Sequence, residues 1–417
     1  MRLFKAFNRL QTAMLLPFLI CSVFVAVAEI MQLICIYTGL AADAKNVLSG
    51  FSESLYALTG YVFCYYITLK LTNGKQAFKA FWSVMCFALL STAANSFVDG
   101  IPLFILGIFT GLLCSFCFNR FGMILALAVT VGTCVIIGIL TGLVSDSWNN
   151  FIMELSGFIS DKAYFSPVLF GVVDNIFSLL NVDTFREMIF NNSYGGSVLI
   201  GDEIVTGVKD MLKAGYSGKL VSTYLSGHYF LLFSLSGISA ALFFDLKGVQ
   251  RYVLLATAVC AVISGNLTFL LLFLFLESPY LFAAVLILSA GAYLAAYVID
   301  LGMGYLADGG ITEMIIYSDK LVYLLAGGVV FVAIGYFVYK FVFEKHGISD
   351  CCNVYIPTRL NGFVTALGGM SNIIRYKDGG IFVRNPKLVD TVSVECEIDE
   401  NFIKTEDERL DELREYL

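Results

Sequence analysis

Residues 10–40 read LQTAMLLPFLICSVFVAVAEIMQLICIYTGL, an apolar run in which Glu29 is the only acidic or basic side chain. A membrane-spanning helix needs about 20 mostly apolar residues, whereas the apolar core of a cleaved signal peptide has only about 7 to 15. The run therefore predicts a first spanning helix. The basic residues ahead of it, Arg2, Lys5 and Arg9, predict that the N-terminus faces the cytoplasm.

Runs of similar composition recur along the chain. Apolar residues make up 58% and charged residues 14% of it, whereas a soluble protein carries about 25% charged residues. Disorder, a collagen-like fibre and a small disulfide scaffold are excluded. We predict an all-α polytopic membrane protein with about ten spans, some of them broken or re-entrant. The further runs cover approximately residues 54–71, 77–97, 101–118, 123–144, 167–180, 223–244, 252–276, 279–303 and 321–343.

The net charge is confined to the C-terminal end. It amounts to −7, and residues 395–417, with ten acidic and three basic side chains, account for all of it. No basic stripe remains that would predict nucleic acid as a partner. Lys340 and Lys345 at the end of the last run predict that the C-terminus is also cytoplasmic, which an even number of spans satisfies.

Motifs of catalysis and metal binding are weak. The two histidines stand in no HExxH or nucleophile-elbow pattern, and the chain has no GxxxxGK[ST] motif. We therefore expect no cofactor, no metal and no ATP hydrolysis by this chain. Cys114 and Cys117 form a CxxC pair without a second pair of ligands, and we expect them to be packed thiols.

Ionisable side chains inside the apolar runs are more informative, because a charge at mid-membrane costs at least ~2.5 kcal/mol. Glu29, Asp174 and His228 either line a cavity or make buried structural hydrogen bonds, and the sequence leaves both interpretations open. Glu277 and Asp300 lie at run ends, where an interfacial helix terminus is the favoured interpretation.

The run over residues 252–276 is interrupted by Ser264-Gly265-Asn266. Broken helices in transporters expose backbone groups to a substrate cavity near the membrane midplane, so the interruption predicts a binding site. The alternative is an ordinary glycine at a close helix crossing.

Several segments of the chain carry a resemblance to a known family. They are residues 10–17, 107–112 with 118–121 (a GIIxGL…YNRF pattern), 201–207, 212–215 and 335–341. Together they resemble the IIC membrane domain of sugar permeases in the phosphoenolpyruvate-dependent phosphotransferase system (PTS), of the glucose/N-acetylglucosamine/maltose type. The resemblance implies a homodimeric permease in a bacterial plasma membrane that moves sugar by an elevator-like motion.

The C-terminal end is similar to the cytosolic IIB domain fused to such permeases, beginning at ALGGMSNII over residues 366–374. The resemblance implies a membrane domain over 1–345, a linker over 346–358 and a small degenerate α+β domain over 359–417. In the family a cysteine of this domain relays phosphate, and its position falls on Gly379, which has no nucleophile. Any phosphate would then come from separate PTS proteins in the cytosol.

The resemblance also suggests a substrate site. The family's GITEP motif, whose glutamate contacts sugar, is aligned with residues 265–269, where Thr268 replaces the acid. The family's GLHH motif is aligned with residues 181–184. Together with the buried ionisable groups, this predicts the substrate-binding residues Asp183, Thr184, His228, Asn266, Thr268, Glu29 and Asp174.

Two functions compete. The favoured one is a divergent permease that moves a sugar or a related small polar solute without relaying phosphate through its own tail. The alternative is a non-transporting membrane sensor or interaction protein derived from such a permease, with the acidic tail as a protein-docking segment.

Overall fold

A computed structural model of the chain describes residues 2–414 except 73–76, 96–102, 163, 181, 183, 247, 318–319, 347–359, 370–371, 378–379, 384, 392, 395 and 406. Among the described residues, six helices are long and apolar enough to cross a membrane, so the chain is an all-α membrane protein. These six segments are Leu10–Tyr37, Leu103–Arg120, Met123–Ser160, Lys219–Asp245, Pro279–Ile299 and Leu321–Val342.

The remaining predicted runs also form helices, but these are shorter or less apolar. The shorter apolar helices are Ala77–Thr92, Ser166–Leu179, Val249–Ser264 and Thr268–Glu277. One prediction was too short, because the helix that was expected to end near residue 144 continues to Ser160. Its second half packs through Trp148, whose ring centroid lies 6.1 Å from that of Phe177.

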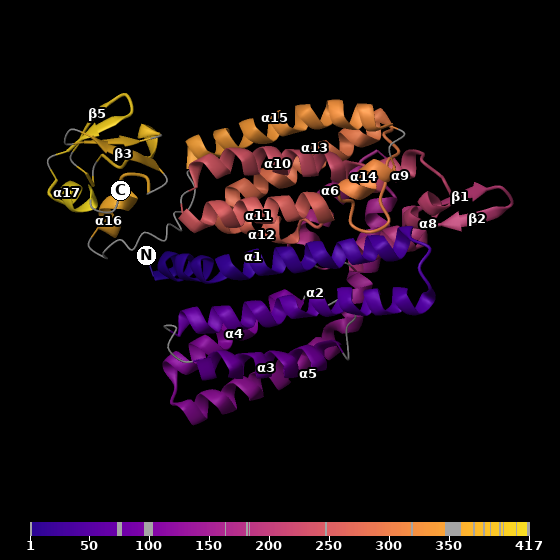
Figure 1. The fold of residues 1–417 in the computed structure, drawn as a ribbon, viewed down its shortest axis with the longest axis horizontal. Helices are drawn as coiled ribbons and strands as arrows, with labels where there is room; N and C mark the ends of the chain where they lie inside the picture. The colour runs from indigo at the N-terminus through magenta and orange to yellow at the C-terminus, as the bar shows by residue number, and fades with distance from the viewer. Residues whose placement is uncertain are drawn as a thin grey trace.

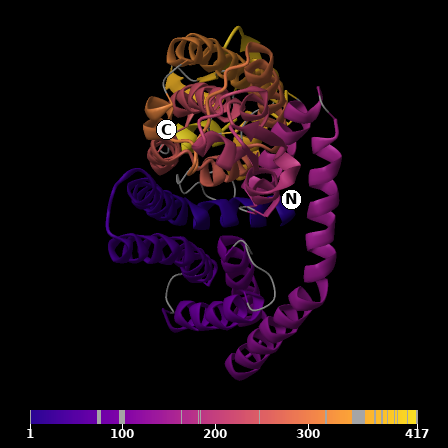
Figure 2. The ribbon, with the colours of Figure 1, turned by 90° about the vertical axis from the view of Figure 1, so that its right-hand side faces the viewer.

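Helix α1 (Arg2–Tyr37) lies between two groups of helices (Figure 1). On one side it packs against the first helical group, and on the other against α11 of the second. The first helical group consists of α2 (Ala42–Leu71), α3 (Ala77–Asn95), α4 (Leu103–Arg120) and α5 (Met123–Ser160). Helix α5 also contacts α6 and α7, and Figure 2 shows it running along one side of both groups.

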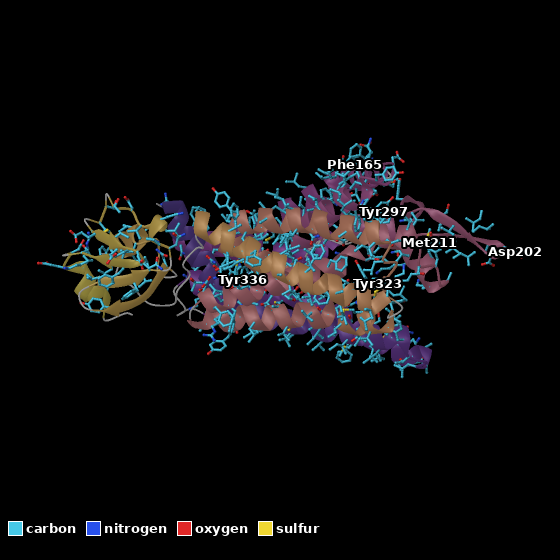
Figure 3. All side chains as sticks on the ribbon, turned by 90° about the horizontal axis from the view of Figure 1, so that it is seen from above. Phe165, Asp202, Met211, Tyr297, Tyr323 and Tyr336 are labelled. Carbon is cyan, nitrogen blue, oxygen red and sulfur yellow. The ribbon has the colours of Figure 1, made fainter. Side chains whose placement is uncertain are left out.

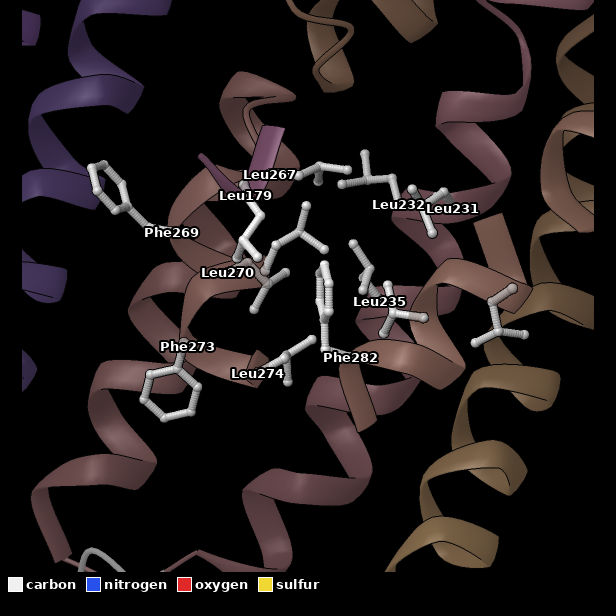
Figure 4. Packing of buried hydrophobic residues seen from close by; sticks show 14 of the residues in the cluster. Leu179, Leu231, Leu232, Leu235, Leu267, Phe269, Leu270, Phe273, Leu274 and Phe282 are labelled. Atoms are coloured by element: carbon white, nitrogen blue, oxygen red, sulfur yellow. The ribbon is translucent and has the colours of Figure 1, made fainter. Parts of the chain in front are cut away.

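The second helical group has a tightly packed apolar core. Its members are α6 (Ser166–Leu179), α9 (Lys219–Tyr224), α10 (Gly227–Asp245), α11 (Gly248–Ser264), α12 (Thr268–Glu277), α13 (Pro279–Ile299) and α15 (Leu321–His346). Leu231 and Leu235 of α10, Leu270 and Leu274 of α12, and Phe282 of α13 are buried against one another (Figure 4). Such interdigitated contacts are individually small and collectively large, so they hold these helices together.

The polar stretch after α6 forms small elements at one end of the bundle. They are α7 (Thr184–Asn191), the 3-10 turn η1 (Ser193–Gly195), strands β1 (Ser197–Ile200) and β2 (Glu203–Thr206), and α8 (Val208–Lys213). The strands pair antiparallel, with Leu199 opposite Ile204. Asp202 lies at the tip of this hairpin, which projects from the end of the molecule opposite the C-terminal region (Figure 3). Helices α7 and α8 pack against the bundle through buried side chains such as Phe185, Phe190 and Val208, whereas the hairpin is mostly exposed.

The C-terminal residues form a separate α+β unit with its own core. Its sheet has the antiparallel strand order β3-β4-β6-β5, built from Ile373–Lys377, Gly380–Val383, Phe402–Lys404 and Glu397–Asp399. The 3-10 turn η4 (Pro386–Leu388) and helices α16 (Asn361–Ala366) and α17 (Arg409–Arg414) accompany the sheet, and Phe363, Ile381 and Leu413 are buried in the core. Gly379 lies outside the described residues. The unit sits at the end of the bundle where α1 begins (Figure 1).

Candidate functional site

The break predicted at Gly265 is present. Helix α11 ends at Ser264 and α12 begins at Thr268. Gly265 has φ +82°, a left-handed conformation that glycine adopts without steric cost. Asn266 bridges the gap, because its Oδ1 accepts a hydrogen bond from the Thr268 N–H at 3.1 Å. A Cβ at Gly265 would meet the backbone of Asp308, so the close approach at this glycine is to a loop.

That loop, residues 301–310, is shaped by one buried carboxylate. Glu313 in α14 (Ile311–Ile316) is 0% exposed and accepts four hydrogen bonds. The donors are the backbone N–H groups of Leu306 (2.7 Å), Ala307 (3.0 Å) and Gly309 (2.9 Å) and the hydroxyl group of Tyr37 (2.9 Å). Four donors satisfy a carboxylate, so Glu313 fixes the conformation of the loop.

Asp308 in the same loop faces polar groups from two other elements. Asn266 donates from Nδ2 to Asp308 Oδ2 at 2.9 Å. Arg186 Nη1 lies 3.8 Å from Asp308 Oδ1. The Asp308 side chain is 22% exposed, against 0% for Glu313. Asp308 is therefore the more accessible of the two acids.

Arg186 of α7 links this loop to α6. It donates from Nε and Nη2 to the two carboxylate oxygens of Asp174 at 2.9 and 3.0 Å, and from Nη2 to Ser178 Oγ at 2.8 Å. Burial by itself lowers the pKa of Arg186, but the Asp174 carboxylate outweighs burial, and the pKa is raised well above its ordinary value. The guanidinium group therefore stays charged, and the bidentate pair orients it.

Two further charged side chains belong to this site, Lys209 of α8 and Glu29 of α1. Lys209 Nζ donates to the carbonyl oxygen of Ala307 at 3.1 Å, and burial lowers the pKa of this ammonium group. Glu29 is 2% exposed, and its Oε1 accepts a hydrogen bond from the hydroxyl group of Tyr56. The charged neighbours that interact with Glu29 are Asp308, Glu313 and Lys209.

Several buried polar atoms around this site have no hydrogen-bond partner among the described residues: Glu29 Oε2, His228 Nε2, Tyr293 OH and Tyr305 OH. The His228 ring centroid lies 5.1 Å from that of Tyr305, and both tyrosines interact electrostatically with Arg186. A buried polar atom without a partner costs about 1–3 kcal/mol. Such a group of atoms is therefore suited to bind a polar molecule. We call the whole set the polar cluster: Glu29, Asp174, Arg186, Lys209, His228, Asn266, Tyr293, Tyr305, Asp308 and Glu313.

The structure brings most of the predicted site residues together. Four of them belong to the polar cluster: Glu29, Asp174, His228 and Asn266. The hydroxyl group of Thr184, at the start of α7, is buried without a hydrogen-bond partner among the described residues, and its role in the site stays a prediction. Thr268 begins α12 beside it and is connected through Asn266. Asp183 lies outside the described residues. Asp174 and Glu29 both make buried hydrogen bonds, which agrees with the structural interpretation, while a cavity-lining role for them stays a prediction.

The sequence analysis did not select the residues after α13, although the sequence there contains a signal that could have pointed to them. Residues 310–313 read Gly-Ile-Thr-Glu, which reproduces the first four residues of the GITEP motif, with Met314 in place of the proline. This match is better than the alignment with residues 265–269. Glu313 therefore competes with Thr268 for the position of the motif's acid, and both assignments stay predictions.

Other side chains singled out by the sequence lie elsewhere. Cys114 and Cys117 are buried in an apolar cluster of the first helical group, as packed thiols. Glu277, at the end of α12, is 1% exposed and accepts a hydrogen bond from Gln250 at 3.5 Å. Asp300 ends α13 with φ +52° and accepts a hydrogen bond from Ser222 at 2.9 Å.

Comparison with known proteins adds no relative: no family model matches the chain, and no curated protein matches it.

Proposed function

We propose that the chain is a membrane transporter for a small polar solute, with sugars as the favoured class, and that the solute binds in the polar cluster. The observation that carries the proposal is the group of unpartnered polar atoms, including His228 Nε2 and Tyr305 OH, buried inside an apolar bundle beside a broken helix. A structural core would satisfy such atoms internally. A transport site must leave them available to its cargo.

The mixture of groups suits a polyhydroxylated molecule. Asp308 offers carboxylate lone pairs, Arg186 offers N–H donors, and His228 Nε2 can donate or accept according to its tautomer. Tyr293 and Tyr305 add hydroxyl groups on apolar rings. Glu313 is a positioning residue in this conformation, because its four hydrogen bonds hold the loop that presents Asp308.

The arrangement of the helices supports movement of one part against another. Helix α1 lies between the first helical group and the second, and the polar cluster is built mainly by the second group with α7, α8 and the loop over residues 301–310 (Figure 1). We propose an elevator-like displacement of the second group past the first. The proposal includes about ten membrane segments, counting short and broken helices.

The resemblance to PTS permeases completes the proposal. It includes a homodimer in a bacterial plasma membrane, both termini in the cytoplasm, and a C-terminal domain of IIB type. Gly379 stands at the phosphate-relay position, so phosphorylation of the cargo, if coupled at all, requires a separate donor.

Uptake of radiolabelled glucose, N-acetylglucosamine and maltose by cells expressing the chain tests the proposal, with and without added PTS proteins. We expect cells that express the wild type to accumulate at least one sugar. This uptake should be lost in Arg186→Gln and retained in the control Glu203→Gln, on the exposed hairpin. Correctly inserted protein without uptake of any sugar in either setting would favour the sensor or interaction protein instead.

A further inference from the structure

A cavity lies between α1 and the broken helix α11–α12. Ser22 and Val25 line it from α1, and the first residues of α12 line it from the other side of the break. On α11 the lining residues include Thr257, Cys260 and Ser264, whose spacing of three and four positions places them on one face of that helix. Figure 1 shows α1 beside α11 and α12. The cavity therefore lies where α1 meets the second helical group.

The cavity adjoins the polar cluster through Asn266. This residue lines the cavity, and its Nδ2 donates to Asp308 Oδ2 at 2.9 Å. Its backbone N–H donates to the Oγ of Ser264, another lining residue, at 3.1 Å. Cys260 and Asn266 are half-buried, whereas the other lining residues are buried. The cavity is thus a side pocket of the polar cluster that opens beside Cys260 and Asn266.

The hydroxyl groups in the cavity have already used their hydrogen atoms. Ser22, Thr257 and Ser264 each donate to the carbonyl oxygen four residues earlier in their own helix, at 2.7, 2.6 and 2.8 Å. A hydroxyl group has one hydrogen atom and two lone pairs. These three oxygen atoms can therefore only accept a further hydrogen bond, and Ser264 already accepts one from Asn266.

Such a lining selects the chemistry of its ligand. Ser22 and Thr257 are 3% and 1% exposed, so their lone pairs are shielded from bulk water. A ligand that brings O–H donors satisfies them, whereas a carboxylate or phosphate would place oxygen against oxygen in a site that excludes water. Val25, Phe269 and Leu270 supply apolar walls, which suit the C–H groups of a sugar ring.

The wall formed by α12 is held against α1. The Phe269 ring centroid lies 6.5 Å from that of Phe18 in α1, and the Phe273 ring centroid lies 6.0 Å from it. Phe269 and Phe273 lie on neighbouring turns of α12 (Figure 4). The cavity is therefore bounded by packed rings on the α12 side, and a ligand in it would contact α1 and the broken helix together.

We propose that this cavity is a second subsite of the transport site, which takes a hydroxyl-bearing end of the solute and has Ser22 and Thr257 as its hydrogen-bond acceptors. The subsite rests on the proposed function. It restricts the end of the solute that enters it to an uncharged polyhydroxylated group. Because Ser22 belongs to α1, it also gives α1 a direct part in binding.

Cys260 is a native reporter for the cavity. The purified full chain is treated with iodoacetamide, with and without saturating glucose, N-acetylglucosamine or maltose, and alkylation of each cysteine is followed by mass spectrometry. We expect Cys260 to react, and at least one sugar to slow its reaction severalfold. Cys396 of the C-terminal unit is half-buried as well, and its reaction rate should not change with sugar.

A matched pair of variants tests the acceptor. Thr257→Val keeps the shape of the side chain and removes its oxygen atom, so the dissociation constant of the protecting sugar should rise about fivefold, as for the loss of one ordinary hydrogen bond. The control is Thr110→Val in α4, since Thr110 is 0% exposed and donates to the carbonyl oxygen four residues earlier at 2.7 Å. It should leave the dissociation constant unchanged.

Each contrary outcome has its own meaning. A Cys260 thiol that stays unmodified without sugar would contradict a cavity open beside it, and an unchanged dissociation constant in folded Thr257→Val would overturn the acceptor role. Exchange of a sugar by proteoliposomes without protection of Cys260 would overturn the subsite alone. Neither exchange nor protection with any of the three sugars would overturn the subsite together with the proposed function.

Discussion

The hydroxyl group of Tyr37, at the end of α1, donates a hydrogen bond of 2.9 Å to Glu313 across 276 positions of sequence. This contact connects the helix between the two helical groups to the loop that presents Asp308. Because Glu313 also holds three backbone N–H groups of that loop, a change at either residue should reach the proposed binding site.

Substituting Glu313→Gln should loosen the loop. Glutamine has an NH₂ group in place of one of the two carboxylate oxygens, so one of the loop N–H groups loses its acceptor. Each hydrogen bond to a charged group contributes about 1.5–3 kcal/mol. We expect faster hydrogen exchange at Leu306, Ala307 and Gly309, with a smaller effect for Tyr37→Phe. Unchanged exchange at all three amides would contradict the anchoring role of Glu313.

The Arg186–Asp174 pair should be worth more than any ion pair on the surface. Replacing Arg186 by alanine leaves the Asp174 carboxylate buried and unpaired, which costs about 3–5 kcal/mol. We expect a lower midpoint of thermal unfolding in detergent, partly restored in the double variant Arg186→Ala/Asp174→Asn. Lys213→Ala removes an exposed pair, 60% and 52% exposed, and should cost at most about 1 kcal/mol. Equal losses for the two single variants would refute this ranking.

Gly265→Ala should disrupt the site through the backbone. A left-handed conformation costs a non-glycine residue at least about 1 kcal/mol, and the added Cβ would collide with the backbone of Asp308. We expect lower thermal stability and loss of sugar uptake. The matched control is Gly291→Ala, in a helix where a Cβ meets nothing within 4 Å, and it should be neutral or stabilising by up to about 1 kcal/mol. A fully active Gly265→Ala protein would contradict the close packing of break and loop.

Lys209 should make the stability of the fold depend on pH in the alkaline range. Burial lowers its pKa below the ordinary value of 10.5, so the unfolded chain binds more protons and stability should rise with pH between the folded-state pKa and 10.5. Lys209→Met should flatten that rise in thermal unfolding, whereas Lys213→Met, on an exposed side chain, should not. Identical slopes for the two variants would argue against the effect.

The sequence predicts the helices well because membrane spans are long and apolar, and it predicts the break at Gly265 because Ser-Gly-Asn interrupts such a run. Membrane composition also makes isolated polar residues conspicuous, which is why Glu29, Asp174 and His228 could be selected. Their partners were harder to find. Arg186, Lys209 and Asp308 lie in polar stretches, where a charge is unremarkable until the fold brings it against the bundle.

The sequence analysis also did not predict the full length of α5 or the place of residues 310–313 in the site. The second half of α5 is held by contacts such as that of Trp148 with Phe177, which composition alone does not reveal. The match of residues 310–313 to the first four residues of the GITEP motif was missed because the break at Gly265 looked like a binding site in its own right. In the fold, the break and residues 310–313 lie side by side, so both belong to one site.

Exchange of radiolabelled sugar across proteoliposomes is the most direct measurement of the central claim, that the polar cluster binds a transported solute. Exchange reports binding and passage on the same protein and needs no energy source. Purified wild type and Glu203→Gln should exchange at least one of glucose, N-acetylglucosamine and maltose, and folded Asp308→Asn should not. Exchange by Asp308→Asn at the wild-type rate, or none by folded wild type with any of the three sugars, would contradict the claim.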